Sequence, residues 1–391
     1  MTKTFVLVSF ATAPNSGSER GVGWAFFLGA LELAEKKNFK LEVIVDGRDE
    51  AEIRRYLEAR GKPSEVRLNY VNIPKKIRKL VGKSKSRLSY LVWLPYAARA
   101  LKRLVKEQDV LLVHQVTFAS FVLPSVMERH SFRKYRAVWG PANIALISDG
   151  TWPKTKPIKD LIHQYLRRYL SWVALQNTSY VDLAIANNKH TYEIVRSRNK
   201  DLEPNIFLTL GKGLPDVEKS ALRIVVVGAL VSGKRPWVAI DVLCEPKLRD
   251  FKLQYVGDGE LRKSLEDYAA RRGVRDRVDF LGKKTHQETL NLISGASVLL
   301  HPSSHEGSPW VVGEANTLGT PAIVVEGTGS DTTLLISQAS GTVIRDSKNM
   351  VSDMAESILA WANVPGQSSQ RWNAERASGL LERWWLNFDW Q

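Results

Sequence analysis

The sequence predicts an α/β fold in which two doubly wound domains, each a parallel sheet covered by helices, face a cleft. Three observations favour this fold class. The length of 391 residues suits two domains of ordinary size. Short apolar runs rich in β-branched residues alternate with longer amphipathic stretches, as in parallel α/β proteins. The pattern then restarts after Leu210–Ser220, where Gly211, Gly213 and Pro215 break both periodicities.

The first half of the chain, residues 1–215, is predicted to form an N-terminal domain. Its strands are the short runs of apolar and β-branched residues, a composition typical of strands buried on both faces. They are Thr4–Phe10, Leu41–Val45, Val66–Val71, Asp109–His114, Ala137–Trp139 and Leu183–Asn187. Helices are predicted where apolar residues recur at helical spacing, over Gly23–Lys37, Glu50–Arg60 and Leu161–Gln176.

Residues 216–370 are predicted to form a second domain, in which the same alternation is clearer. Its expected strands are Arg223–Gly228, Lys252–Gly257, Asp279–Gly282, Ser297–His301 and Pro321–Val325. Helices are expected between them at Pro236–Leu243 and Glu260–Arg272. The tail, residues 371–391, carries four of the twelve Trp at helix-like spacing: Trp372, Trp384, Trp385 and Trp390. We expect this Trp-rich tail to pack as a helix across the two domains.

The composition excludes several classes of protein. The single cysteine, Cys244, excludes an intramolecular disulfide and a cysteine-based zinc site, and it fits a reducing compartment. No apolar run reaches the roughly 18 residues of a membrane-spanning helix; the nearest, Val116–Met127, is interrupted by Ser and Pro. Phe5–Ala13 is followed by polar residues, which favours a buried strand over a signal peptide. We therefore expect a cytoplasmic protein.

The positive charge is concentrated in the first half of the chain. Residues 1–215 hold 36 Lys and Arg against 19 Asp and Glu, whereas residues 216–391 hold 20 against 22. The densest stretch, Lys75–Lys106, has 11 basic residues and no acidic one, with apolar and aromatic residues among them. This segment suits an anionic membrane surface, an acidic acceptor, or a solvated helix face. Nucleic acid is not expected as a partner, because no nucleic-acid-binding motif accompanies the charge.

Three turns that follow predicted strands are candidates for ligand binding, because ligands of parallel sheets bind at the carboxyl ends of the strands. The first turn is Ser16–Trp24, which places Gly17 and Ser18 before the start of a helix. Glycine allows close approach of a ligand, and the N-terminus of a helix offers N–H groups to an anion. The glycine spacing does not match the dinucleotide-binding fingerprint.

The second turn, Gly228–Pro236, follows the first strand of the second domain. It carries Lys234 and Arg235 just before a helix whose first residue is expected to be Pro236. Two cations at a strand end suit a diphosphate, and a solvated loop is an equally good explanation. The glycine spacing and the residue after the lysine both differ from those of a phosphate-binding P-loop.

The third turn is the most specific of the three, and it runs from His301 to Ala315. Ser308 is expected to cap the following helix and Pro309 to be its first residue. Glu306 then lies in the loop, while Glu314 lies more than one turn inside the helix. A carboxylate that deep in the helix has nothing to cap, so it needs a hydroxyl or cationic partner, and the hydroxyls of ribose or a sugar fit that need.

At this point the sequence resembles the retaining glycosyltransferases of the GT-B fold, family four (group 1 type). The resemblance is carried by the Glu306 and Glu314 pair within Pro302–Ala315. Four neighbouring motifs agree with it in order and spacing: Val227–Lys234, Leu253–Leu261, Val278–Gly282 and Leu318–Pro321. In the first half, Gly17–Glu19 and Trp139–Pro141 resemble one branch of the family. The resemblance implies two Rossmann-like domains, and it is stronger over the second domain than over the first.

The resemblance implies transfer of a hexosyl-type sugar from a nucleotide diphosphate-sugar to an acceptor, with retention of the anomeric configuration. The implied acceptor is a glycan, a lipid-linked molecule or a secondary metabolite, and the implied process is the synthesis of a cell-surface polysaccharide. The donor is a substrate; no cofactor is implied, and the family generally needs no metal. The second domain would hold the donor and the first mainly the acceptor.

Residue by residue, the resemblance assigns catalytic roles to Glu306, at the hydroxyls of the transferred sugar, and to Lys234, at the diphosphate. Glu314 would bind the ribose hydroxyls. The other implied donor-binding residues are Gly17, Ser18, Arg235, Gly257, Gly282, Gly307, Ser308, Pro309 and Trp310.

Two departures from the family pattern keep a second hypothesis open. Family members commonly have Arg where this chain has Ala229, so one phosphate-binding cation is missing, and we hypothesise that Arg235 replaces it. The run Gly140–Asn143 also differs from several relatives. His114 and Asn143 are weaker candidates for acceptor contact, and a lone histidine such as His114 is more often structural. The alternative is therefore a non-catalytic nucleotide-binding protein or partner subunit with the same fold.

Overall fold

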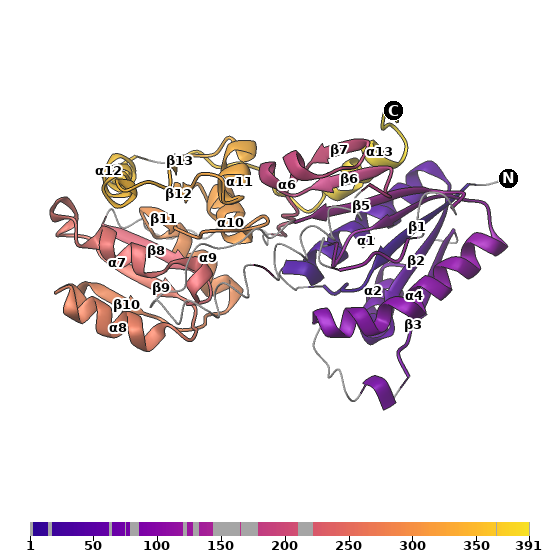
Figure 1. Ribbon diagram of the computed structural model, residues 1–391, viewed down its shortest axis with the longest axis horizontal. Coiled ribbons are helices and arrows are strands. Elements are labelled where there is room, and N and C mark those ends of the chain that lie inside the picture. The colour runs from indigo at the N-terminus through magenta and orange to yellow at the C-terminus, as the bar shows by residue number, and fades with distance from the viewer. Residues whose placement is uncertain are drawn as a thin grey trace. The chain divides into compact units, whose positions relative to one another are not determined.

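The chain forms two compact units, which are described separately (Figure 1). Unit 1 comprises Met1–Ile144, Tyr169–Phe207 and Ala374–Gln391, and unit 2 comprises Ala145–Arg168 and Leu208–Asn373. The computed structural model describes residues 3–14, 18–61, 65–74, 76–78, 86–119, 123–127, 133–143, 165, 179–209, 222–364 and 366–390. The expected boundary at 215/216 lies outside these residues, as does the expected helix Leu161–Gln176 apart from Tyr165.

Unit 1 contains a seven-stranded parallel sheet with the order β3-β2-β1-β4-β5-β6-β7. Its strands are β1 (Thr4–Ser9), β2 (Lys40–Asp46), β3 (Val66–Val71), β4 (Val110–Gln115), β5 (Arg136–Ala142), β6 (Leu183–Ala186) and β7 (Asn199–Leu202). Six of them confirm predicted strands. β7 was not predicted because it carries only one apolar residue, Leu202, so no period is visible.

The described helices of unit 1 are α1 (Ser18–Lys37), α2 (Glu50–Arg60), α4 (Arg87–Glu107), α6 (Lys189–Ile194) and α13 (Arg376–Trp385), with a 3-10 turn η1 (Gly47–Asp49). Helix α1 begins five residues before the predicted start at Gly23. Gly23 lies inside this helix, and its lack of a side chain allows the helix to pack against the chain after β1. A Cβ atom there would lie 1.9 Å from the carbonyl oxygen of Ala11.

The tail expected to pack across the domains divides between the units at Asn373 and Ala374. Trp372 is buried in unit 2, where its indole N–H donates to Asn316. Helix α13 belongs to unit 1 and packs on α1 at Gly29, where a Cβ atom would come within 2.7 Å of the backbone nitrogen of Ser378. The prediction that the tail packs across both domains therefore stays a prediction.

Unit 2 contains a six-stranded parallel sheet with the order β10-β9-β8-β11-β12-β13, the arrangement of a doubly wound fold. Its strands are β8 (Arg223–Val227), β9 (Lys252–Val256), β10 (Val278–Phe280), β11 (Val298–His301), β12 (Ala322–Val325) and β13 (Gly341–Ile344). Its described helices are α7 (Trp237–Leu243), α8 (Arg262–Arg271), α9 (His286–Ser294), α10 (Trp310–Leu318), α11 (Ser330–Ser337) and α12 (Met350–Ala362). The 3-10 turns η3 (Ser232–Lys234), η4 (Pro246–Leu248) and η5 (Arg275–Arg277) connect them.

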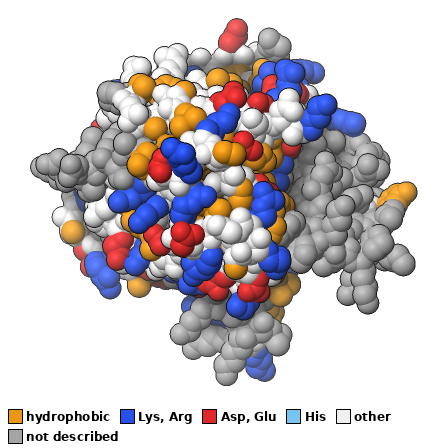
Figure 2. All heavy atoms as spheres, turned by 90° about the vertical axis from the view of Figure 1, so that its left-hand side faces the viewer, with side chains coloured by type: hydrophobic (Ala, Val, Ile, Leu, Met, Phe, Trp, Pro, Cys, Tyr) orange, Lys and Arg blue, Asp and Glu red, His pale blue; other side chains and the backbone are white. Residues whose placement is uncertain are grey.

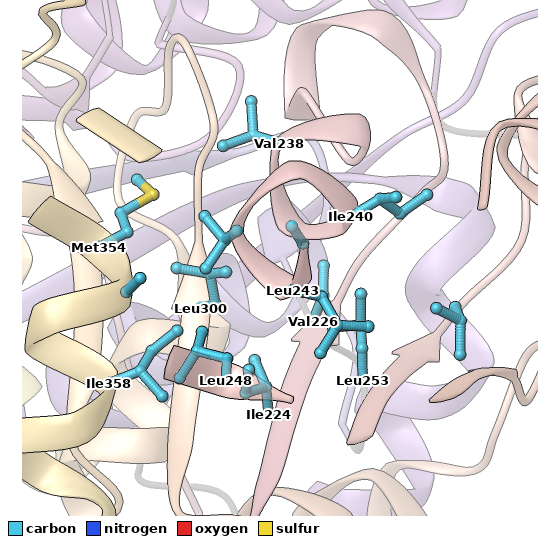
Figure 3. Packing of buried hydrophobic residues seen from close by; sticks show 14 of the residues in the cluster. Ile224, Val226, Val238, Ile240, Leu243, Leu248, Leu253, Leu300, Met354 and Ile358 are labelled. Atoms are coloured by element: carbon cyan, nitrogen blue, oxygen red, sulfur yellow. The ribbon is translucent and has the colours of Figure 1, made fainter. Parts of the chain in front are cut away.

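The core of unit 2 lies on both faces of this sheet. Because side chains alternate along a strand, Ile224 and Val226 of β8 enter one cluster and Val225 enters the other. The first cluster packs the sheet against α7, α8 and α12, and Figure 3 shows Val238, Leu243, Met354 and other members converging there. The second packs the sheet against α9, α10 and α11. Burial on both faces leaves the carboxyl ends of the strands as the place for a ligand.

The predicted starts of two helices in unit 2 were wrong by one residue. Pro236 and Pro309 are the N-cap residues of α7 and α10, and Trp237 and Trp310 are the first helical residues. The difference at α10 arises because Pro309 adopts an extended backbone, with ψ at 114°, so Ser308 lies one residue outside the cap.

Basic and acidic side chains are interspersed on the face of unit 2 that Figure 2 shows. This matches the nearly balanced count of 20 Lys and Arg against 22 Asp and Glu over residues 216–391. Among the described residues, no helix combines the length and the apolar character needed to cross a membrane.

Candidate active site

The candidate site of unit 2 lies where the strand order reverses, between β8 and β11. In doubly wound sheets this reversal opens a crevice at the carboxyl ends of the strands. The loop after β8 and the loop after β11 meet there, since Ser304 donates to the carbonyl oxygen of Gly233 through both its backbone N–H and its hydroxyl, each at 3.0 Å. Two of the three turns singled out in the sequence are thus neighbours in the structure.

Glu306 is the centre of this site. Its Oε1 accepts from the ammonium of Lys234 and from the hydroxyl of Ser303, the latter at 2.5 Å. The Nε2 atom of His301 lies 3.2 Å from the same oxygen, and the His301 side chain is only 3% exposed. The structure therefore joins the two residues assigned as catalytic, and it adds Ser303 and His301, which the sequence did not single out.

These contacts keep the Glu306 carboxyl ionised. Burial by itself would raise its pKa, because a charge is costly away from water. The nearby imidazole of His301, followed by the charge and hydrogen bond of Lys234, outweighs burial and holds the pKa of Glu306 well below its usual range. An ionised carboxylate only accepts hydrogen bonds, so Glu306 is suited to bind hydroxyl groups and unsuited to donate a proton.

Arg235 is occupied in holding the neighbouring loop. Its backbone is left-handed, with φ at 46°. Its guanidinium donates to the carbonyl oxygens of Pro302 at 2.7 Å and Ser303 at 3.3 Å, and it pairs with Asp346 at 2.7 Å. The hypothesis that Arg235 replaces the arginine missing at Ala229 therefore loses support, since its donors already face the protein. Arg235 positions the loop that carries Glu306.

Three glycines follow neighbouring strands of unit 2 and form a surface that is called the glycine floor below. Gly228, Gly257 and Gly282 follow β8, β9 and β10 and have positive φ angles of 145°, 134° and 68°. Gly257 donates to the carbonyl oxygen of Gly282 at 2.9 Å, and a Cβ atom on Gly257 would lie 2.0 Å from the carbonyl oxygen of Gly228. Gly257 thus lets the ends of β8 and β9 approach closely, while the guanidinium of Arg262 lies beside Gly282, 3.5 Å from the position of an added Cβ.

Glu314 lies in the second turn of α10 and is 7% exposed, as its distance from the helix start predicted. Its partner is His286, whose Nε2 lies 2.9 Å from Oε1 of Glu314. This hydrogen bond raises the pKa of His286 above its ordinary value, although burial opposes the shift. The sequence predicted that Glu314 needs a hydroxyl or cationic partner, and the structure supplies the imidazole of His286.

His286 was not among the predicted site residues, although the sequence contains a signal for its position. Thr285 and Glu288 have the spacing of a capping box, and they form one: the backbone N–H and the hydroxyl of Thr285 donate to Glu288 at 2.8 and 2.6 Å. This pattern places His286 at the first position of α9.

A second loop supports the backbone of Glu306. The N–H of Glu306 donates to the carbonyl oxygen of Thr328 at 2.5 Å. Asp331 fixes the same loop by accepting from the N–H groups of Gly327 at 2.8 Å and Gly329 at 3.0 Å. A Cβ atom on Gly329 would lie 2.3 Å from the carbonyl oxygen of Glu306. This support was not predicted, because it depends on β12 lying next to β11.

The remaining predicted site residues lie in both units of the chain. Gly17 lies outside the described residues, and Ser18 begins α1. Asn143 follows β5, and its side-chain oxygen accepts from Asn188 at 3.0 Å, beside the start of α6. Gly307, Ser308 and Trp310 lie in unit 2, where they continue the chain from Glu306 into α10.

His114 does not offer a nitrogen to an acceptor. The residue is fully buried; its Nδ1 accepts from the indole N–H of Trp385 at 3.1 Å, so Nε2 carries the proton and donates to the carbonyl oxygen of Gly140 at 2.9 Å. Burial lowers the pKa of His114 to about 3. The ring is a neutral structural group, which corrects its assignment as an acceptor-side residue.

Comparison with known proteins agrees with this architecture. Residues 215–377 match the family described as glycosyl transferases group 1. An uncharacterized glycosyltransferase of Methanocaldococcus jannaschii is 30% identical over 139 residues, which cover 35% of this chain and 37% of that protein. The chain therefore spans little more than a third of the length of this relative.

Solved structures extend the likeness in fold to nearly the whole chain. The lipopolysaccharide outer core galactosyltransferase WaaB in its apo form has a TM-score of 0.61 at 15% identity, covering 97% of this chain and 95% of that one. The Anabaena protein HepE in complex with UDP has a TM-score of 0.55 at 15% identity, covering 99% and 100%. The region from 215 to 377 is thus similar to the glycosyl transferases group 1, and the chain as a whole has the two-domain, Rossmann-like GT-B fold.

Proposed function

We propose that this chain transfers a sugar from a nucleotide diphosphate-sugar to an acceptor hydroxyl, with retention of the anomeric configuration. The observation that carries the proposal is the pairing of an ionised Glu306 with Lys234 where the strand order of unit 2 reverses. Glu306 accepts from hydroxyls of the transferred sugar, Lys234 binds the diphosphate, and Glu314 binds the ribose. The glycine floor at Gly257 and Gly282 receives the base.

The proposed chemistry needs stabilisation of a leaving group more than it needs a proton donor in the protein. The bond between the anomeric carbon and the diphosphate oxygen breaks, and a bond from that carbon to the acceptor oxygen forms. The acceptor's proton passes to the released diphosphate. Because the diphosphate gains charge as it leaves, a fixed cation such as Lys234 stabilises the transition state more than the ground state. The backbone N–H groups of Gly307, Ser308 and Trp310 are proposed to assist, whereas Pro309 has no N–H to donate. No resident metal is part of this scheme.

The proposal is tested first by binding of nucleotides. Thermal unfolding of the wild type is measured against UDP, GDP, ADP and CDP and their glucose or mannose derivatives, UDP being the nucleotide that the HepE structure contains. A ligand at about 100 times its dissociation constant adds roughly 2.7 kcal/mol of stability. We expect a shift with one base that is lost in Glu314→Ala, a variant that stays folded.

Transfer itself is then measured with the donor identified by that panel. Glu306→Gln keeps the shape of the side chain and removes its charge, so we expect sugar transfer to fall by at least a hundredfold while nucleotide binding persists. Product analysis by NMR gives the anomeric configuration. Wild-type turnover in Glu306→Gln, or an inverted product, would refute the assignment of Glu306 or the retention of configuration.

We further propose that the segment predicted for this role, Lys75–Lys106, binds an anionic membrane surface at the cytoplasmic face, where a lipid-linked or cell-surface acceptor receives the sugar. Residues 75 and 79–85 lie outside the described part of the chain, so the observations that support this proposal concern α4. One face of α4 is exposed along its whole length. It begins at the basic Arg87 and continues with the apolar residues Leu88, Leu91 and Pro95. Its second half exposes the basic residues Arg99, Lys102, Arg103 and Lys106, and the acidic Glu107, which lies 3.9 Å from Arg103. Each basic residue near an anionic lipid surface contributes about 1 kcal/mol.

Sedimentation with vesicles tests this membrane proposal. The wild type is compared with a Lys102→Glu and Lys106→Glu double variant, on vesicles with and without phosphatidylglycerol. A Lys40→Glu and Arg55→Glu double variant is the control, because it makes the same change in net charge at exposed positions elsewhere in unit 1. Equal binding by the two double variants would show that α4 has no special role.

One observation favours the alternative of a non-catalytic nucleotide-binding or partner subunit. Ala229 leaves a phosphate-binding cation missing, and Arg235 is committed to Pro302, Ser303 and Asp346 rather than replacing it. This alternative predicts tight binding of a nucleotide without transfer to any acceptor or to water, and it predicts that Ala229→Arg raises donor affinity.

A further inference from the structure

The pair of Glu314 and His286 is the best-defined polar contact of unit 2 that the proposed roles leave unexplained. Among the described residues, His286 is the only hydrogen-bond partner of the Glu314 carboxylate. The two side chains differ in burial, because 9% of the Glu314 side chain is exposed against 61% of the His286 side chain. A buried carboxylate is thus held by one partner that reaches it from the surface.

We propose that His286 is a positioning residue that fixes the Glu314 carboxylate for the ribose of the donor nucleotide. Its Nε2–H donates to Oε1, which leaves Oε2 as the acceptor for a ribose hydroxyl. This inference rests on the proposed function, in which Glu314 binds ribose. It adds that the orientation of Glu314 is set by a residue of a different helix.

The surroundings of His286 suit it to this role. The capping box of Thr285 and Glu288 fixes the first turn of α9, and α9 packs against α10, which carries Glu314. A glutamate side chain has three rotatable bonds, and a hydrogen bond from a fixed neighbour restricts them before the ligand arrives. Pre-ordering of this kind raises affinity for the ligand without adding a new contact to it.

The same contact has little importance for the stability of the fold. An ion pair or hydrogen bond with one strongly exposed partner typically contributes little to folding, since solvent competes for it. Because the imidazole is 61% exposed, water can reach the Glu314 carboxylate once His286 is removed, so we expect only a small fall of the melting temperature together with weaker nucleotide binding. This separation distinguishes a positioning residue from a structural one.

The test is a binding cycle measured by calorimetry. The wild type, His286→Ala, His286→Gln and Glu314→Ala are titrated with UDP, GDP, ADP and CDP, and the tightest binder is then compared with its 2′,3′-dideoxy form. Gln287→Ala is the control, because Gln287 neighbours His286 on the same helix and bonds only to Asn291 among the described residues.

We expect His286→Ala to raise the dissociation constant of the ribonucleotide about tenfold, the scale of one hydrogen bond to a charged group. His286→Gln, whose amide can donate from a similar position, should restore most of the affinity. The effect of His286→Ala should vanish with the dideoxy nucleotide and in the Glu314→Ala background.

Three results would overturn the inference. An unchanged affinity in His286→Ala would show that Glu314 needs no positioning. An equal loss with the ribonucleotide and the dideoxy nucleotide would place the effect elsewhere in the site. If the wild type binds none of the four nucleotides, the proposed function itself fails, and this result is distinguishable because it precedes any substitution.

Discussion

Substitution of Gly257 by Ala provides a direct test of the glycine floor. The φ angle of Gly257 is 134°, in a region that residues with a Cβ atom rarely adopt. The added Cβ would lie 2.0 Å from the carbonyl oxygen of Gly228, and this neighbour is backbone rather than a flexible side chain. The ends of β8 and β9 would have to separate by more than about 1 Å to reach ordinary contact.

The expected cost follows from these two effects. Backbone strain of this kind costs roughly 1–3 kcal/mol, and displacement of packed strand ends costs roughly another 1–3 kcal/mol. The free energy of unfolding should therefore fall by about 3 kcal/mol or more. For a unit of this size, each kcal/mol lowers the melting temperature by roughly 2–4 °C, so calorimetry should find a drop of about 6–12 °C.

Alanine substitutions at two other glycines of unit 2 distinguish the cost of backbone strain from the cost of the steric clash. Gly273 has φ at 70° with no atom within 4 Å of an added Cβ, so Gly273→Ala should cost only the strain, about 1 kcal/mol. Gly233 has an ordinary φ and equally open space, so Gly233→Ala should have almost no effect. The reasoning is refuted if Gly257→Ala melts at or above the temperature of Gly273→Ala.

Three further predictions concern other parts of the chain. Arg376→Ala should destabilise unit 1 by about 2 kcal/mol in urea unfolding, because the buried Glu203 would lose its contact at 2.6 Å and keep the longer one to Arg383 at 3.4 Å, and because the carbonyl oxygens of Pro204 and Ile206 would lose a donor; a change below about 0.5 kcal/mol would contradict this. His114 stays neutral in the folded state down to pH about 3 but is protonated in the unfolded chain below about 6.5, so stability should fall as pH drops between these values; His114→Gln should show a shallower fall of melting temperature with acid, and an unchanged slope would argue against it. Sugar transfer should survive dialysis against EDTA, since Lys234 is the proposed diphosphate cation, and activity that only Mg²⁺ or Mn²⁺ restores would oppose this view.

The fold was largely predictable because the strands of a parallel sheet are buried on both faces. Such strands are short continuous apolar runs, and β8, with Ile224 to Val227 in sequence, is the clearest case. The same reasoning explains the misses. β7 pairs with β6 although its residues Asn199–Leu202 are mostly polar, and side-chain contacts such as that of Asn199 with the carbonyl oxygen of Asp182 also hold it, so tertiary context rather than composition makes it a strand.

The site was predictable as far as it lies in contiguous motifs. Glu306 and Lys234 lie in loops after strands and Glu314 lies in the second turn of a helix, so their positions follow from the strands, whereas the direct contact of Lys234 with Glu306 was not predicted. The contacts between motifs were not predictable. Whether Arg235 faces a ligand or the carbonyl oxygens of Pro302 depends on backbone geometry that sequence spacing does not fix.

Unit 1 is assembled from three separate stretches of chain, and the last of them is Ala374–Gln391. During synthesis the ribosome produces residues 1–207 long before α13. The part of unit 1 that buries Trp384 and Trp385 therefore cannot complete its packing until α13 has been made. Unit 2 has all of its described residues by Asn373 and can finish folding earlier. The half of the protein that is made first would then be the last to mature, and until α13 arrives its apolar surface would be exposed to chaperones.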